Sequence, residues 1–329
     1  MFSEKKMKAS KFVFCIVFLW VVLPCCYFSQ PVPSDEEKIK FLVTFSKRAT
    51  AKFGDDDFTQ ILFFVIPEKT KDPVYLRVFD PDVGGKNDEK VRLFNSKTRF
   101  SVRGGTGTHS AEKIKKSASE GDTESGILLA SKTFDRSTSY DEQWYTFGPF
   151  NPAEGELQPE YGGYVFKFTA EGLDGDDGNL YRLFLSSQKD KNVAIQGGNC
   201  FYYECSFRLP EKINQVSHIY PFVGTNVIKV NIHIFDYDND GTIRTVSVAK
   251  NGLPFFSDKD GEWSEIQFDI EKKEQNTSMD IQFVKNRNIK FNNVVVFITN
   301  QEKARIPFYT IPIGGIPKYK PNIIVTPGN

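Results

Sequence analysis

The fold class is decided by two similar stretches, Val74-Tyr75-Leu76-Arg77-Val78-Phe79-Asp80-Pro81-Asp82 and Val230-Asn231-Ile232-His233-Ile234-Phe235-Asp236-Tyr237-Asp238. In both, apolar residues occupy every second position until a Phe-Asp pair ends the run. Alternation with a period of two is typical of a strand with one buried face. The residues expected to face a core are Val74, Leu76, Val78, Val230, Ile232 and Ile234. Asn231 and His233 should point away from it.

Other landmarks occur in the same order when Asp80 is set against Asp236. Upstream, Phe63-Phe64-Val65-Ile66-Pro67 matches His218-Ile219-Tyr220-Pro221, and downstream Trp144 matches Trp263. Further on, Leu180–Leu185 matches Asn293–Ile298. The sequence therefore predicts an all-β protein built from two tandem β-sandwich domains of the jelly-roll or immunoglobulin-like kind. The alternative is chance similarity between two β-rich halves.

The expected domains cover residues 31–190 and 195–317, followed by a proline-containing tail at 318–329. The boundary is placed near Gln188 to Gly198, which is rich in Lys, Asn and Gly. Asp80 and Trp144 are 64 residues apart, whereas Asp236 and Trp263 are only 27 apart. The first copy is therefore expected to carry an extra loop over about 94–126.

The first 30 residues have the pattern of a secretory signal peptide. Four lysines, the last at Lys11, precede an apolar run from Phe12 to Leu23. That run is short for a transmembrane helix, although an uncleaved anchor is an alternative. A lipoprotein site at Cys25 is a weaker option because Pro24 directly precedes the cysteine. We expect an exported chain located in a periplasm, at an outer-membrane surface or outside the cell.

Composition and charge exclude several classes of protein. Of 329 residues, 40% are hydrophobic, so the chain can form a large core. Lys+Arg and Asp+Glu both number 42, and this balance does not provide the basic field of a nucleic-acid-binding protein. No other apolar run is long enough to span a membrane once the leader is removed. The remaining cysteines, Cys200 and Cys205, lie in a strand-like segment and are expected to be unbridged thiols.

Acidic loops are the sharpest candidate site. Asp236, Asp238 and Asp240 alternate before Gly241, a spacing that lets carboxylate oxygens converge on Ca²⁺, with Asp258 or Asp260 as a further ligand. Ser247 stands where an EF-hand would have its closing Glu, so a true EF-hand is excluded. Asp80, Asp82 and Asp88 form a looser version of the same pattern. The alternative is that these aspartates only form turns.

Signals for catalysis are lacking. His109, His218 and His233 have no metal-ligand spacing, and no nucleophile-elbow motif occurs. We therefore expect a protein that is not an enzyme. Trp144 and Trp263 occupy equivalent positions and are expected to pack in the two cores, the alternative being that exposed aromatic rings stack on sugars.

Two resemblances to known families rest on quoted residues. The strand ending in Phe79-Asp80-Pro81-Asp82 resembles the hairpin of bacterial pre-peptidase C-terminal-type β-sandwiches, which accompany secreted enzymes. The stretch from Gly126 to Lys320 includes Trp144-Tyr145-Thr146-Phe147-Gly148-Pro149-Phe150 and Ile311-Pro312-Ile313-Gly314-Gly315. It looks like the exported β-rich region that precedes the peptidoglycan-binding domain in some outer-membrane-protein-A-type proteins of Gram-negative bacteria. Neither resemblance implies a catalytic residue, and peptidoglycan anchoring is not carried over because no such C-terminal domain is expected here.

The sequence thus predicts a non-catalytic exported structural or binding protein of the bacterial cell envelope, with calcium as a candidate stabilising ion and an envelope protein or a glycan as partner. The first alternative is a lectin-like carbohydrate-binding module. A less favoured alternative is a secreted hydrolase, for which two converging carboxylates in a cleft would be evidence.

Overall fold

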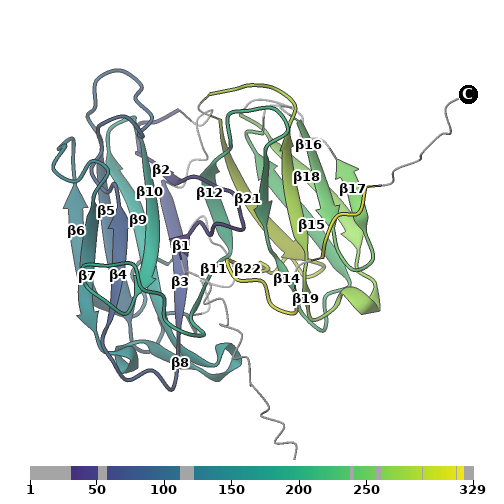
Figure 1. Cartoon of the computed structure of the whole chain (residues 1–329), viewed down its shortest axis with the longest axis horizontal. Coiled ribbons are helices and arrows are strands. Elements are labelled where there is room, and N and C mark those ends of the chain that lie inside the picture. Colours follow the sequence, from purple (N-terminus) through teal and green to yellow (C-terminus); the bar gives the residue numbers. More distant parts are fainter. Residues whose placement is uncertain are drawn as a thin grey trace, which may run out of the picture.

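The computed structural model describes residues 31–50, 58–111, 122–237, 241–255, 261–290, 292–315 and 317–321. It is 49% strand and 3% helix, so the predicted all-β class is confirmed. The predicted signal peptide, residues 1–30 with Cys25, lies outside the described residues. Figure 1 shows two lobes side by side, one formed by the first half of the chain and one by the second.

Within the described residues, the first half contributes ten strands and two 3₁₀ turns. They are β1 (Pro31–Val32), β2 (Leu42–Phe45), β3 (Thr59–Pro67), β4 (Val74–Phe79), β5 (Lys97–Gly104), β6 (Ile127–Phe134), β7 (Trp144–Phe150), η2 (Pro152–Glu154), β8 (Glu156–Gln158), η3 (Pro159–Tyr161), β9 (Gly163–Asp174) and β10 (Gly178–Ser186).

The described part of the second half contributes twelve strands and one 3₁₀ turn. They are β11 (Asn199–Tyr202), β12 (Glu204–Arg208), β13 (Val216–Ile219), β14 (Phe222–Val223), β15 (Lys229–Phe235), β16 (Gly241–Val246), β17 (Asn251–Phe255), β18 (Trp263–Asp269), η4 (Lys272–Glu274), β19 (Thr277–Ser278), β20 (Asp280–Lys285), β21 (Asn293–Asn300) and β22 (Phe308–Tyr309).

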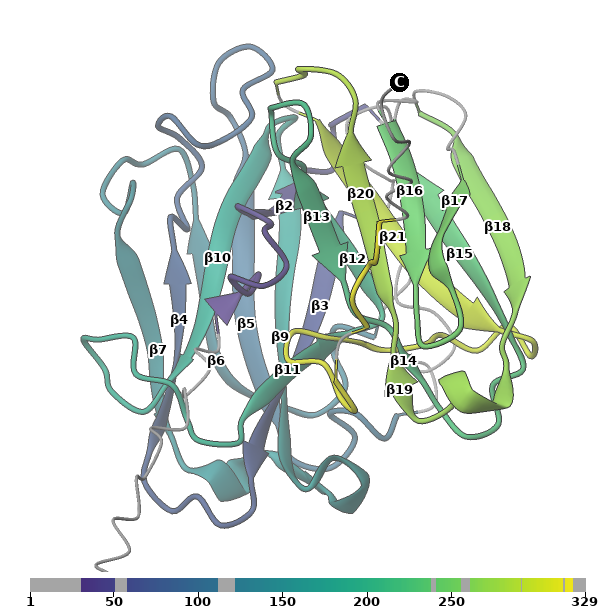
Figure 2. The same cartoon turned by 45° about the vertical axis from the view of Figure 1, so that its right-hand side comes forward.

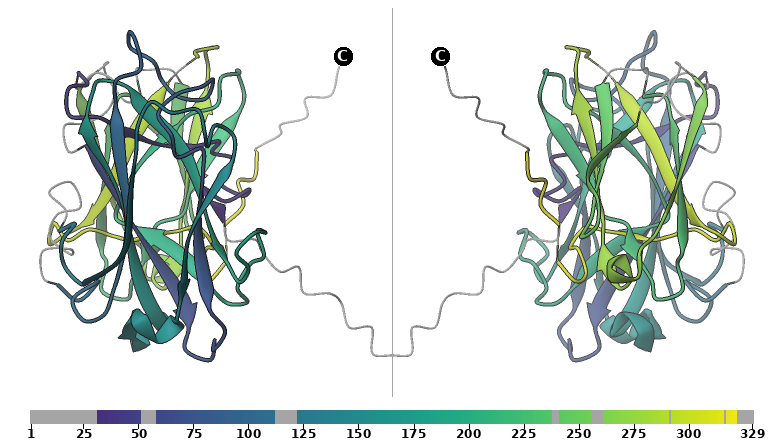
Figure 3. Two further views of the ribbon diagram at one scale, coloured as in Figure 1. Left: turned by 90° about the vertical axis from the view of Figure 1, so that its left-hand side faces the viewer. Right: turned by 90° about the vertical axis from the view of Figure 1, so that its right-hand side faces the viewer.

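The two halves share their strand order. The largest sheet runs β18-β15-β21-β12-β2-β10-β4-β7, with β1 beside β10, so that β12-β21-β15-β18 mirrors β2-β10-β4-β7 across the middle. The facing layers are β3-β9-β5-β6 in the first half and β13-β20-β16-β17 in the second. The facing layer of the first half is extended by β11 and β22, and Figure 3 shows the layers edge-on. By position in these orders, β3 corresponds to β13, β4 to β15, β7 to β18 and β10 to β21. Descent of the two halves from one repeated unit stays a prediction.

The lobes are nevertheless joined. Strand β2 pairs with β12 through Leu42 and Phe207, which makes one sheet continuous across both lobes (Figure 2). The largest core cluster contains residues of both halves, and β11 pairs with β3 of the first half. The division of the chain into two domains at residues 190–195 therefore stays a prediction, since the largest sheet and the largest core cluster both continue from one half of the chain into the other.

The predicted register is confirmed by burial. The side chains of Val74, Leu76, Val78, Val230, Ile232 and Ile234 are buried in the main core cluster. Asn231 and His233 are half-exposed on the opposite face of β15.

The predicted extra loop at 94–126 is too wide. Lys97–Gly104 forms β5, which pairs with both β6 and β9 inside the sheet. The prediction failed because this segment is rich in polar residues, although two of them, Thr98 and Ser101, are buried in the sheet. The connection that lengthens the first copy at this point runs from Gly105 to Gly126, and residues 112–121 of it lie outside the described part.

Both remaining cysteines are free, as predicted, and both are also buried. Cys200 lies in β11 and Cys205 in β12, and the strand is interrupted between them at Tyr203. Both side chains belong to the main core cluster, so their role is to fill space.

Candidate functional site

The Asp80 carboxylate caps the end of strand β4. Its Oδ1 accepts a hydrogen bond from the Glu142 backbone N–H at 3.0 Å, and Oδ2 accepts one from Asn87 Nδ2 at 2.5 Å. Asp80 itself has a left-handed backbone with φ 58°, a conformation that Asp tolerates better than most residues. The carboxylate therefore fixes the turn that follows β4 against the residues that precede β7.

The carboxylates of Asp82 and Asp88 also accept hydrogen bonds from backbone N–H groups. Asp82 Oδ2 accepts from the Tyr140 N–H at 2.6 Å, while Asp88 accepts from the N–H groups of Gly84 and Leu180, both at 2.7 Å. Burial raises the pKa of Asp80, Asp82 and Asp88, and these hydrogen bonds act in the opposite direction. The structure thus brings the three residues into one loop, where each carboxylate faces backbone donors.

The second acidic loop is described only in part. Asp236 follows β15 with φ 65°, and its Oδ1 accepts from the Gly261 N–H at 3.1 Å. Asp238 and Asp240 lie outside the described residues, as do Asp258 and Asp260, the expected further carboxylates. Within the described part no group of three or more His, Cys, Asp or Glu side chains is arranged to hold a metal. Calcium binding stays a prediction.

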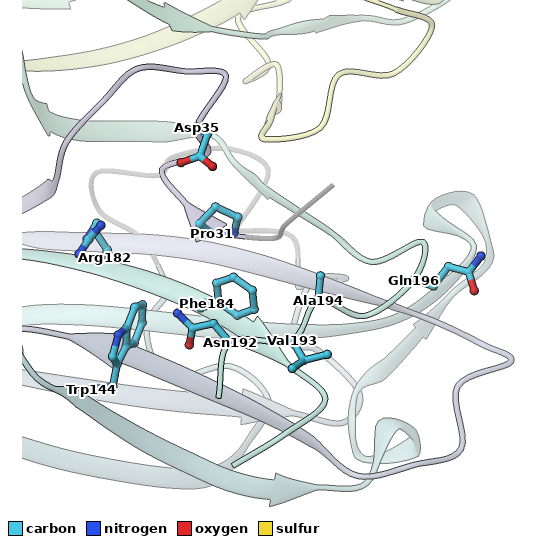
Figure 4. A pocket seen from close by; sticks show the side chains of 9 residues that line it. All are labelled: Pro31, Asp35, Trp144, Arg182, Phe184, Asn192, Val193, Ala194 and Gln196. Atoms are coloured by element: carbon cyan, nitrogen blue, oxygen red, sulfur yellow. The ribbon is translucent and has the colours of Figure 1, made fainter. Parts of the chain in front are cut away.

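A large cleft lies on the outer face of the first lobe. It has a volume of about 710 Å³ and is lined by Pro31, Asp35, Trp144, Arg182, Phe184, Asn192, Val193, Ala194 and Gln196. Figure 4 shows Trp144 and Arg182 at one end of this cleft and Gln196 at the other. Pro31 and Asp35 approach from the N-terminal segment. Apolar walls with a few polar side chains are typical of small-molecule sites, and the volume falls in their usual range of about 300–1,000 Å³.

Trp144 is held by an arginine and two aromatic rings. The Arg77 guanidinium lies 5.1 Å from the Trp144 ring centroid, and the ring centroids of Phe79 and Phe184 lie 5.3 Å and 6.5 Å from it. Arg77 also donates to Asn192 Oδ1 and to Thr146 Oγ1, the latter at 3.2 Å. These contacts leave the indole half-exposed in a fixed position.

Arg182 is the one basic residue among the described residues that line this cleft. Its guanidinium stacks 4.3 Å from the Phe79 ring centroid, and its buried Nε has no hydrogen-bond partner among the described residues. Burial lowers the pKa of Arg182, while Asp80 and Asp35 act to raise it. A buried N–H donor without a partner costs free energy in the folded state.

The second lobe repeats the aromatic part of this arrangement. Trp263 pairs with Phe235 in β15 as Trp144 pairs with Phe79 in β4. Its ring lies 5.0 Å from Phe297, the counterpart of Phe184. Trp263 is 45% exposed, so the prediction that both tryptophans pack in the cores is wrong. The reason is that directly paired residues place their side chains on the same face of a sheet. Trp144 is paired with Phe79 and Trp263 with Phe235, and both Phe residues lie on the face that points away from the core.

The three histidines do not meet. His109 is fully buried, with Nε2 2.9 Å from Tyr203 Oη, while His218 Nδ1 lies 2.9 Å from Asp280 Oδ1. His233 stacks on Phe297 at 4.2 Å. Each is thus placed in a separate packing environment.

Sequence reasoning missed Arg182, Asn192 and Asp35 as lining residues of the cleft. A signal existed for Arg182, a charged residue opposite the outward Phe79 in the middle of an apolar strand. None existed for Asn192 and Asp35, which lie in loops outside any recognisable motif.

Comparisons with known proteins add no family assignment. No protein-family model matches the chain, and no match was found among curated protein sequences. Within the described residues there is no helix long and apolar enough to cross a membrane.

Proposed function

We propose that this chain is a non-catalytic, exported binding protein of the bacterial cell envelope, and that the cleft beside Trp144 binds a carbohydrate. The observation that carries the proposal is the pairing of a half-exposed indole with the Arg182 guanidinium in the lining of one cleft. Sugars offer an apolar ring face, which stacks on indole, and hydroxyl groups, which accept from guanidinium and amide donors.

The rest of the lining supports the same chemistry. Asn192 and Gln196 provide amide donors and acceptors, and Asp35 provides a carboxylate acceptor. Phe184, Val193 and Ala194 complete the apolar wall. Such a mixture suits a neutral polar ligand with one flat face better than it suits a lipid or a peptide helix.

A hydrolase is less well supported. Asp35 is the one carboxylate among the described residues that line this cleft. A glycosidase mechanism in its common form uses a pair of carboxyl groups about 5–10 Å apart across the scissile bond. Binding without cleavage is therefore the function we propose.

Export and envelope location rest on the lysine-rich apolar leader at residues 1–30 and on the two family resemblances described above. Calcium is proposed as a stabilising ion of the loop containing Asp236, Asp238 and Asp240. In this account Asp80, Asp82 and Asp88 contribute mainly by organising the loop beside Arg182.

The test is a glycan array probed with the full chain and with Trp144→Ala. We expect binding to a subset of glycans that the variant loses. Trp263→Ala is the matched control, because it removes the equivalent ring outside this cleft. Equal binding by wild type and Trp144→Ala would remove the cleft from the proposal, and release of free sugar from bound glycans would show an enzyme.

A further inference from the structure

A second cleft lies where the two lobes meet, and its lining is strongly cationic. The cavity measures about 380 Å³ and is bordered by segments from both halves of the chain. The basic residues of the lining are Lys38, Lys40, Lys86, Arg208, Lys212 and Lys290. The whole chain has no net charge, so this concentration of positive charge is local.

Two of these cations are already neutralised. Arg208 donates from Nη2 to Glu89 Oε2 at 2.5 Å, and both side chains are almost fully buried. Lys86 pairs with Glu142 at 2.8 Å on the surface. The Glu89–Arg208 pair joins the two lobes, and Arg208 forms part of the wall of the cleft.

Lys38, Lys40 and Lys212 have no ion-pair partner among the described residues. Ile39 and Phe41 are buried in the core, which leaves Lys38 and Lys40 exposed. Lys212 comes from the other lobe, in a turn closed by a hydrogen bond from its N–H to Gln215 Oε1 at 3.0 Å. Glu211 is the one carboxylate in the described lining that could offset them.

We propose that this cleft binds a ligand carrying phosphate or sulfate groups. Like charges held together are unfavourable unless an anion compensates them, and a concave site raises the local potential further. The lysines come from segments far apart in the sequence but fixed relative to one another by the pairing of β2 with β12. A multiply charged anion is favoured over a single carboxylate because cations from both lobes border the same cavity.

This inference is independent of the carbohydrate site. It uses none of the residues that line the cleft beside Trp144. Its ligand would be held by attraction to lysine side chains, whereas the carbohydrate would be held by stacking on an indole ring. Failure of one proposal would therefore leave the other standing.

The experiment is isothermal titration of the full chain with pyrophosphate and, in a second arm, with the disulfate ester of a short diol, which has no sugar ring to bind beside Trp144. We expect saturable binding in at least one arm, and comparison of the arms distinguishes phosphate from sulfate as the natural group. Binding should weaken steeply between low and physiological salt, because the exposed charges are screened over about 10 Å at 0.1 M salt.

The deciding variant is Lys38→Glu/Lys40→Glu. It should weaken binding by about tenfold or more, since attraction becomes repulsion at the cleft. The matched control is Lys69→Glu/Lys71→Glu, which makes the same charge change on exposed residues of the turn between β3 and β4. Lys212→Glu provides an independent variant from the second lobe, and Trp144→Ala should leave this binding unchanged. No saturable binding in either arm, or equal loss in the two double variants, would overturn the proposal.

Discussion

Asp80 and Asp236 occupy the same structural position in the two lobes. Each follows an outward-facing Phe at the end of its strand, and each has a left-handed backbone, with φ 58° and 65°. Each carboxylate accepts a hydrogen bond from the N–H of the residue two positions before a tryptophan, Glu142 before Trp144 and Gly261 before Trp263. The likeness of the two halves therefore extends to individual hydrogen bonds.

The first prediction concerns this turn. Asp80→Ala should lower the free energy of unfolding by about 2–4 kcal/mol, because it leaves the Glu142 N–H without its acceptor and puts Ala in a left-handed conformation. Asp80→Asn should lower the free energy of unfolding clearly less, since the Asn side chain keeps one acceptor oxygen and Asn tolerates a positive φ. Urea denaturation measures both. Equal losses for Ala and Asn would contradict the role given to the carboxylate.

A second prediction concerns pH. Glu37 is fully buried between the lobes, where Tyr202 Oη donates to Oε1 at 2.6 Å and the Ser34 N–H donates to Oε2 at 2.8 Å. Burial raises the pKa of Glu37 from 4.5 to about 7. The folded state therefore holds the proton more tightly than the unfolded state, and the contribution of Glu37 to stability declines as pH rises between these two values.

The variant Glu37→Gln mimics the protonated form and should remove this decline. The difference in free energy of unfolding between wild type and variant should change by up to about 3 kcal/mol between acidic and mildly alkaline pH. The change should favour the variant at the alkaline end. Urea denaturation of both proteins at about pH 4 and about pH 8, on either side of the two pKa values, measures it. A pH-independent gap would show that Glu37 titrates normally.

Calcium provides a third prediction. If the loop with Asp236, Asp238 and Asp240 binds Ca²⁺, the ion stabilises the fold by about 2.7 kcal/mol at a hundredfold excess over its dissociation constant. The melting temperature should rise in millimolar calcium and fall back with chelator. Asp238→Ala should abolish the rise, whereas Asp72→Ala, at an exposed position outside the predicted calcium loops, should not. A melting temperature indifferent to calcium would leave these residues as turn formers.

The thiols offer a fourth test. Burial raises the pKa of Cys200 and Cys205 well above the usual range. Neither thiolate is available in the native state, so both should resist a disulfide-exchange reagent until denaturant is added, and both should then react. Rapid labelling of the native protein would contradict the core positions of these residues.

Much of the fold was predictable because strand patterning is local. The alternation of apolar residues around Leu76 and Ile232 determines which face of each strand is buried, and the matched landmarks order the strands. The burial of Trp144 and Trp263 was mispredicted because equivalent positions in the two halves do not show which face of the sheet a side chain occupies. That face is set by the pairing of Trp144 with Phe79 and of Trp263 with Phe235.

The sites were less predictable because their partners are distant in sequence. Whether the Asp88 carboxylate faces an ion or an N–H depends on Leu180, which is 92 residues away. The cleft beside Trp144 likewise needs Asp35 and Asn192 to come together from separate loops. Only the three-dimensional structure supplies those distances.

The most direct test of the central proposal is titration of the best glycan from the array while the fluorescence of Trp144 is followed. In the variant Trp20→Phe/Trp263→Phe, Trp144 is the sole tryptophan of the sequence. We predict a saturable change in its emission, and at least a tenfold loss of affinity in Arg182→Ala, about 1.4 kcal/mol. Binding with no change in Trp144 emission and no effect of Arg182→Ala would contradict the proposal that this cleft is the carbohydrate site.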